Sequence, residues 1–141
     1  MLVEFEITIY ADPDGLSSIS SQIESLLSES LEKGSWMLYV TTLELDSEDY
    51  AESEYLVRQF SIENKNVDHG ERTLKVIHIG IVDTINVNEF GGELIKSFSP
   101  ESFTEPAGVT VADRFPWELS SDIIEDPAGR ERFFANYPSL S

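Results

Sequence analysis

The sequence predicts a single α+β domain over residues 1–141, with a mostly antiparallel sheet of about five strands and two main helices on one face. Apolar residues alternate at a period of two near the N-terminus and then recur at a helical spacing in the next segment. A chain of 141 residues is also long enough to bury one core. The predicted order is strand, helix, three strands, helix, strand, and a ferredoxin-like topology with an extra strand is one arrangement that fits it.

The first strand and the first helix have the clearest patterns. Residues 3–9 place an apolar side chain at every second position, which predicts a half-buried strand. The turn residues Ala-Asp-Pro-Asp-Gly at 11–15 end that strand. Apolar residues from Leu16 to Leu31 then recur at steps of three and four, which predicts a helix with one apolar stripe, and Gly34 ends it.

The middle of the chain alternates between apolar and polar segments. Residues 36–45 and 55–62 are rich in aromatic and branched side chains, which predicts two strands. Between them, residues 46–54 are too acidic for a core, so we expect a solvated connection. Residues 72–83 are predicted to form a central strand, because the middle of the segment, 76–82, is apolar on both faces. The spacing in 87–98 predicts the second helix.

The C-terminal segment, residues 99–141, is rich in proline and aromatic side chains, and we expect it to pack on the core. A short strand-like run occupies 109–112. The dipeptide Asp126-Pro127 combines a capping residue with a proline suited to the first helical turn, which predicts a short helix after it.

The charge balance excludes several classes of partner. The chain has 27 acidic and 9 basic residues, a formal net charge of −18. Direct binding to nucleic acid or to anionic lipid is not expected, because such binding depends on Lys and Arg. No long apolar run predicts a membrane span, no secretory signal is expected, and the absence of cysteine fits a reducing compartment, so we expect a cytoplasmic protein.

The acidic residues are concentrated in the first half of the chain. Residues 1–64 hold 14 acidic and 2 basic residues, a net charge of −12. Six of the acids follow one another without an intervening cation, and we call them the acidic run: Glu44, Asp46, Glu48, Asp49, Glu52 and Glu54. Two interpretations remain open, namely a solvated surface that serves solubility or adaptation to salt, and a docking surface for a basic partner.

Under the second interpretation, the chain is similar in its physical profile to immunity proteins, which neutralise a nuclease toxin by covering its basic surface. Acidic mimics of nucleic acid share this profile. We therefore predict an inhibitor of a basic protein, without enzymatic activity. The expected partner-binding residues are the acidic run, Tyr50 as a central aromatic contact, and Trp117.

Two alternatives belong to other classes of protein. His78 lies mid-strand, with Gly80 on the same face, and a carboxylate such as Asp83 or Asp113 could orient it at the floor of a pocket. This would suit a small enzyme or ligand-binding domain, although a hydrogen-bonded core histidine is the simpler interpretation. The other alternative is an accessory subunit of a larger assembly. No catalytic motif occurs, so we predict no catalytic residue, cofactor or metal, and the sequence does not fix the oligomeric state.

Overall fold

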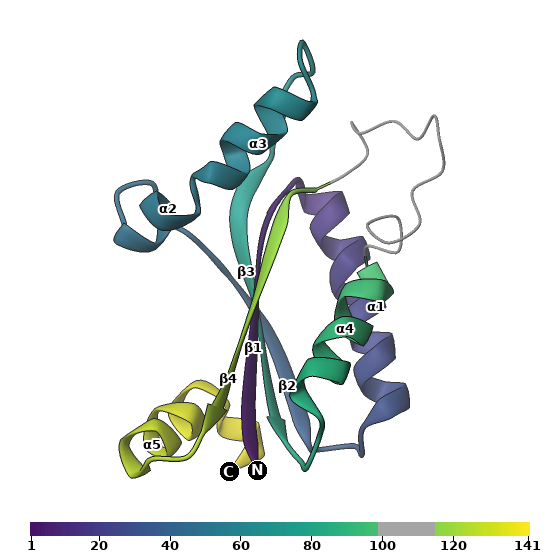
Figure 1. Ribbon diagram of the computed structural model, residues 1–141, viewed down its shortest axis with the longest axis vertical. Coiled ribbons are helices and arrows are strands. Elements are labelled where there is room, and N and C mark those ends of the chain that lie inside the picture. The colour runs from purple at the N-terminus through teal and green to yellow at the C-terminus, as the bar shows by residue number, and fades with distance from the viewer. Residues whose placement is uncertain (99–114) are drawn as a thin grey trace.

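The computed structural model describes residues 1–98 and 115–141. Within these residues, one or two helices separate each strand from the next along the chain (Figure 1). Their order is β1 (Leu2–Ala11), α1 (Pro13–Ser30), β2 (Trp36–Thr42), α2 (Glu48–Ser53), α3 (Tyr55–Glu63), β3 (Thr73–Val82), α4 (Val87–Phe98), β4 (Trp117–Ile124) and α5 (Pro127–Asn136), followed by the 3-10 turn Pro138–Leu140.

The four strands form one antiparallel sheet in the order β2-β3-β1-β4. The helix α1 connects β1 to β2, and β3 lies between these two strands in the sheet. The helix α4 connects β3 to β4, and β1 lies between them. This pair of split β-α-β units is the ferredoxin-like strand order. The α+β class and the antiparallel sheet are therefore confirmed, but the described residues contain four strands where about five were predicted.

One face of the sheet is closed by α1 and α4 (Figure 1). The described residues also form α2, α3 and α5, so the prediction of two main helices is matched only in part. The odd-numbered residues of β1 point to this face, and Ile7 and Ile9 are fully buried there. Ile23 and Leu27 of α1 and Leu94 of α4 pack against them. This apolar layer is the main core of the protein, and we call it the closed face.

Within residues 1–98 and 115–141, the opposite face is covered at its two ends and not in its middle. At one end, Leu56 and Phe60 of α3 pack on Tyr10 and Leu74 of the sheet. At the other end, α5 and the residues after it pack around Leu2. Figure 1 shows α2 and α3 on one side of the gap and α5 on the other, with the strands running between them. We call this the open face.

The segment from 46 to 62 differs from its prediction. Residues 48–53 form the short helix α2, with Ser47 as its cap, instead of a solvated connection. The predicted strand at 55–62 is wrong, because the segment forms α3. The physical reason is the spacing of Leu56 and Phe60, four residues apart, which lets a two-turn helix bury both side chains.

The C-terminal segment contains a strand that was not predicted. β4 pairs with β1 along its whole length, so that Ile9 lies opposite Trp117 and Leu2 opposite Ile124. The predicted helix after Asp126 is confirmed as α5. Asp126 caps it, because its Oδ2 accepts a hydrogen bond from the Gly129 amide at 3.2 Å. The strand-like run at 109–112 lies outside the described residues. Within 1–98 and 115–141, no helix combines the length and the apolar character that crossing a membrane requires.

Candidate functional site

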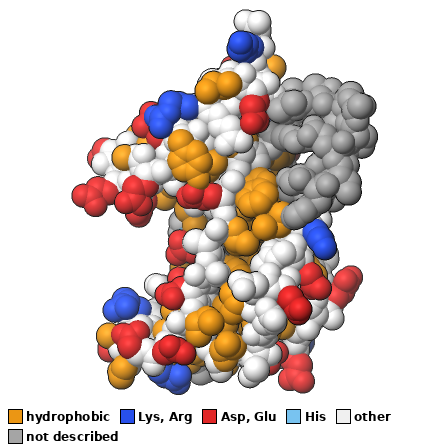
Figure 2. Space-filling view, viewed as in Figure 1, with side chains coloured by type: hydrophobic (Ala, Val, Ile, Leu, Met, Phe, Trp, Pro, Cys, Tyr) orange, Lys and Arg blue, Asp and Glu red, His pale blue; other side chains and the backbone are white. Residues whose placement is uncertain are grey.

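The uncovered middle of the open face forms a hollow between α3 and α5. Figure 2 shows this hollow, with acidic side chains at its base and on both of its sides. Side chains from all four strands face it, and we call this surface the acidic groove. Its residues are Glu4, Glu6, Thr8, Tyr39, Thr41, Val76, His78, Glu118, Ser120 and Asp122.

The strand register places the charged residues of the groove side by side. Glu4 lies directly opposite Asp122, and Glu6 lies between His78 on β3 and Ser120 on β4. Glu118 is two residues from Ser120 and points to the same face. The strand positions of this face carry four carboxylates and no Lys or Arg, so the groove is an electrostatically negative surface.

The ionised form of Glu4 is disfavoured by its surroundings. Its partial burial raises the pKa of its carboxyl group, and the neighbouring carboxylates of Glu6 and Asp122 raise the pKa further. The hydroxyl of Tyr137 donates a hydrogen bond to Glu4 Oε2 at 2.8 Å, which lowers the pKa in part. A cation placed beside Glu4 would stabilise the ionised carboxylate and lower its pKa.

The pKa of Glu6 is shifted in the opposite direction, because His78 lies beside its carboxyl group. Its Oε1 lies 3.6 Å from His78 Nδ1, and this interaction holds the pKa of the carboxyl group below its ordinary value. The other ring nitrogen of His78, Nε2, shares a hydrogen bond with Thr41 Oγ1 at 2.8 Å. The ring also stacks on Tyr39, with centroids 4.5 Å apart and planes 9° from parallel. His78 is thereby fixed by side chains from β1 and β2.

Glu118 connects the groove to the helices beside it. Ser53 at the end of α2 donates a hydrogen bond to Glu118 Oε1 at 3.3 Å, and the Tyr55 hydroxyl donates one to Oε2. Burial, together with this carboxylate, raises the pKa of Tyr55 to about 12. The junction of α2 and α3 is therefore attached to β4, and it forms one wall of the groove.

The predicted pocket beside His78 is occupied by the protein itself. An added Cβ at Gly80 would lie only 2.6 Å from ring atoms of Tyr137, so the space above this glycine is filled. The carboxylate next to His78 is Glu6, whereas Asp83 accepts a hydrogen bond from the Thr84 amide in the following turn. Asp113 lies outside the described residues. His78 is partly exposed in the groove instead of lying at the floor of a pocket.

The six side chains of the acidic run are all exposed. Glu48 and Asp49 lie in the first turn of α2, where negative charge is favourable, and Glu54 forms an ion pair with Arg58 at 3.8 Å. Because α2 leads into the wall of the groove, the run extends the negative surface beyond the sheet. Figure 2 shows acidic side chains gathered on α2.

The two predicted aromatic contacts lie apart from each other. Tyr50 is half-buried and packs against the cluster around Leu56 and Phe60, which leaves part of its ring exposed next to the acidic run. Trp117 points to the closed face and packs edge-on against Phe98, with centroids 5.5 Å apart. The structure therefore brings Tyr50 and the acidic run together near the groove but places Trp117 on the other side of the sheet.

Four carboxylates of the site were missed from the sequence: Glu4, Glu6, Glu118 and Asp122. The signal for the first two was present, because both occupy the polar positions of a strand whose other positions are apolar. The second pair had no such signal, since β4 itself was not predicted.

In the part of the chain that the structure describes, no group of three or more His, Asp or Glu side chains is placed to hold a metal ion. The sequence matches no known protein family, and no curated protein matches it. The function must therefore be argued from the groove and its charge.

Proposed function

We propose that the protein binds and neutralises a basic protein partner, and that the acidic groove and the acidic run form the binding surface. The observation that carries this proposal is the groove itself. It is an open surface on which the strands present four carboxylates and no Lys or Arg. The six exposed acids of the acidic run adjoin it.

The energetics of the groove favour a cationic occupant. The carboxyl group of Glu4 is partly buried beside Glu6 and Asp122, and its pKa is raised in spite of the hydrogen bond from Tyr137, so its ionised form is disfavoured. A Lys or Arg side chain from a partner would offset the repulsion between these carboxylates. The wider negative field, from a net charge of −18, would also steer a basic protein and speed its association.

The most specific form of the proposal is an immunity protein for a bacterial nuclease toxin. A nuclease binds phosphates through Lys and Arg, so its active surface is basic and complementary to the groove. Covering that surface would exclude the nucleic acid and inhibit the enzyme, and an acidic mimic of nucleic acid would act in the same way. The proposed compartment is the cytoplasm, since a chain without cysteine suits a reducing environment.

Affinity capture from host lysate at low salt, followed by a salt gradient, tests this proposal. We expect the wild-type protein to retain a basic protein that elutes at moderate salt and whose nuclease activity falls when the protein is added back. The variant Glu44→Gln/Asp46→Asn/Glu52→Gln should retain less of it, because three exposed charges of the acidic run are removed.

A matched control removes three exposed acids from the other side of the molecule. The variant Glu24→Gln/Glu29→Gln/Glu32→Gln changes the net charge by the same amount on and just after α1. Equal losses of retained partner in both variants would show that net charge, and not the position of the acidic run, determines binding. Failure of the wild-type protein to retain any basic protein would refute the proposed function.

A further inference from the structure

β4 is an edge strand of the sheet, and its inner edge is fully paired with β1. No strand within 1–98 or 115–141 pairs with its outer edge. Residues 120–123 are exposed, which leaves backbone donors and acceptors accessible along this stretch. An extended segment of another protein could therefore add to the sheet here.

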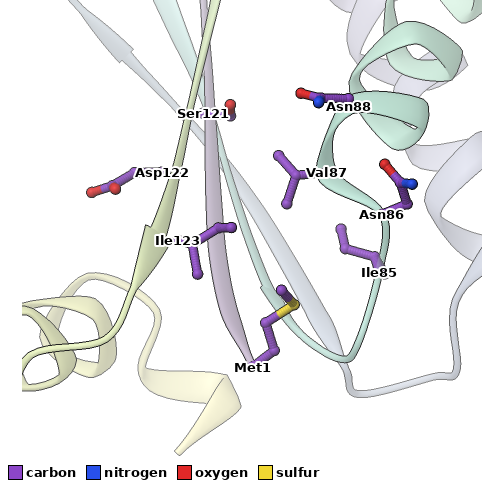
Figure 3. Close-up of a pocket in the computed structure, with 8 residues that line it drawn as sticks. All are labelled: Met1, Ile85, Asn86, Val87, Asn88, Ser121, Asp122 and Ile123. Atoms are coloured by element: carbon purple, nitrogen blue, oxygen red, sulfur yellow. The ribbon is translucent and has the colours of Figure 1, made fainter.

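The two sides of β4 differ in chemistry. On the side of the closed face lies an open pocket of about 490 Å³ between β4 and the start of α4. Figure 3 shows Ile123, Val87 and Met1 around this pocket. Ile123 is 41% exposed, although it is a large apolar side chain in a regular strand. The lining also includes the polar residues Asn86, Asn88 and Ser121, so the apolar contact that this side offers to an added strand comes mainly from the exposed Ile123 side chain.

On the other side of β4 lies the acidic groove. Figure 3 shows the Asp122 carboxylate pointing away from the pocket, and Glu118 lies four residues earlier on the same side of the strand. A strand added beside β4 would place alternate side chains over the pocket and over these carboxylates. The edge therefore selects for an alternation of apolar and cationic residues.

The other edge of the sheet lacks this selectivity. β2 (Trp36–Thr42) is also an edge strand, and its Val40 is 38% exposed on the same face as Ile123. However, β2 contains no charged residue. Of the two edges of the described sheet, β4 is therefore the one that offers charge complementarity to a basic partner.

We propose that the outer edge of β4 binds an extended segment of the basic partner as an added strand, with apolar side chains over the Ile123 pocket and Lys or Arg side chains over Asp122 and Glu118. This inference rests on the proposed function and specifies how the partner is held. Main-chain hydrogen bonds supply affinity, and the two sides of the strand supply specificity.

The same charges disfavour a second copy of this chain as the occupant. A symmetric pairing of two β4 strands would bring like carboxylates together, in a protein that already has a net charge of −18. The edge is thus protected against self-association while it remains open to a basic strand.

A synthetic peptide of alternating lysine and valine, blocked at both ends, tests the proposal directly. Calorimetry at low salt should detect binding, and hydrogen exchange of the β4 amides should slow when the peptide is present. A second peptide has the same sequence but N-methylated amides on the edge facing the protein. We expect it to bind at least about tenfold more weakly, because the interstrand hydrogen bonds are lost.

Two matched variants locate the site. Ile123→Lys and Val40→Lys each replace an exposed branched side chain on an edge strand and change the net charge equally. Urea unfolding and circular dichroism verify that both variants fold. We expect Ile123→Lys to lower the affinity for the peptide by at least about tenfold and Val40→Lys to change it by less than about twofold.

The inference would be overturned by no binding of the alternating peptide, by equal binding of the N-methylated peptide, or by equal losses of affinity in the two variants. A concentration-dependent dimer that only Ile123→Lys abolishes would show that a second copy occupies the edge and would also overturn it. The proposed function fails separately, when no basic protein is captured from the lysate. If the Ile123→Lys variant still captures the basic protein, the proposed function stands and the proposed role of β4 is contradicted.

Discussion

The two faces of the sheet use the same strands for different purposes. On β1, the side chains of Val3, Phe5 and Ile7 are fully buried beneath α1 and α4, whereas Glu4 and Glu6 on the alternate positions line the acidic groove. The closed face is continuous and apolar. On the open face, the described residues form apolar clusters at the two ends, where α3 and α5 cover it, and mostly polar side chains lie between them.

This difference separates the stability of the protein from its proposed binding function. Burial of apolar area is the dominant favourable contribution to folding, and most of it lies on the closed face. The middle of the open face contributes little apolar burial and carries four carboxylates close together. Substitutions on the two faces should therefore have effects of different kind and size.

The largest expected effect is on the closed face. Replacing Ile7 by Ala leaves a cavity beneath α1 and α4, because the side chain is fully buried, and should lower the free energy of unfolding by about 2–5 kcal/mol. Urea denaturation measures this change. Ser120→Ala, on the open face, should change it by less than about 0.5 kcal/mol. Comparable losses in the two variants would break the distinction between the faces.

The next effect concerns the attachment of the C-terminal residues to the open face. A methyl group at Gly80 would collide with the Tyr137 ring, so Gly80→Ala should destabilise the protein by about 1–3 kcal/mol. Gly92 in α4 has nothing within 4 Å of an added Cβ, and Gly92→Ala should stabilise the protein by about 0.5–1 kcal/mol. Thermal unfolding distinguishes the two, and an unchanged midpoint for Gly80→Ala would contradict the packing of Tyr137 on the strand.

The smallest changes in stability are expected when either of the two glutamates of β1 is replaced by Gln, and the two changes should have opposite signs. The pKa of Glu4 is raised by burial, so its charge opposes folding at neutral pH. Glu4→Gln should increase stability at pH 7, and the gain should disappear as the pH falls through the raised pKa. The pKa of Glu6 is lowered by His78, so Glu6→Gln should decrease stability above the unfolded-state pKa.

Both changes should be below about 1 kcal/mol, since the side chains are partly exposed to solvent. Their pH dependence is measured by repeating urea denaturation between neutral and acidic pH. The loss in Glu6→Gln should vanish once the pH is below the lowered pKa, where Glu6 is protonated in the wild-type protein too. The same sign for both variants at pH 7 would contradict the assigned environments.

The patterned elements could be predicted from the sequence because their residues repeat at one spacing. The alternation in β1 and the stripe from Leu16 to Leu31 in α1 each point to one buried side, and both elements were predicted. β4 was missed because it pairs on one edge only and carries polar side chains such as Ser120 and Asp122 at its exposed end. α3 was mistaken for a strand because two turns are too short to show a helical repeat.

The candidate site could be predicted only in part. The acidic run is contiguous in sequence, so its charge was evident. The groove joins Glu4 near the start of the chain to Asp122 near its end, and only the strand register makes them neighbours. The hydrogen bond from Tyr137 and the filled space above Gly80 are likewise tertiary contacts, which no local pattern indicates.

The central claim is that the acidic groove binds a basic partner through its charge. Its most direct test is the association rate of the captured partner, measured by stopped-flow at increasing salt for the wild type and for Glu6→Gln/Asp122→Asn. We predict that the variant associates roughly tenfold more slowly at low salt, that the difference narrows as salt is added, and that Glu24→Gln/Glu29→Gln on α1 behaves like the wild type. A wild-type rate that does not depend on salt, or an equal loss in the α1 variant, would contradict the claim.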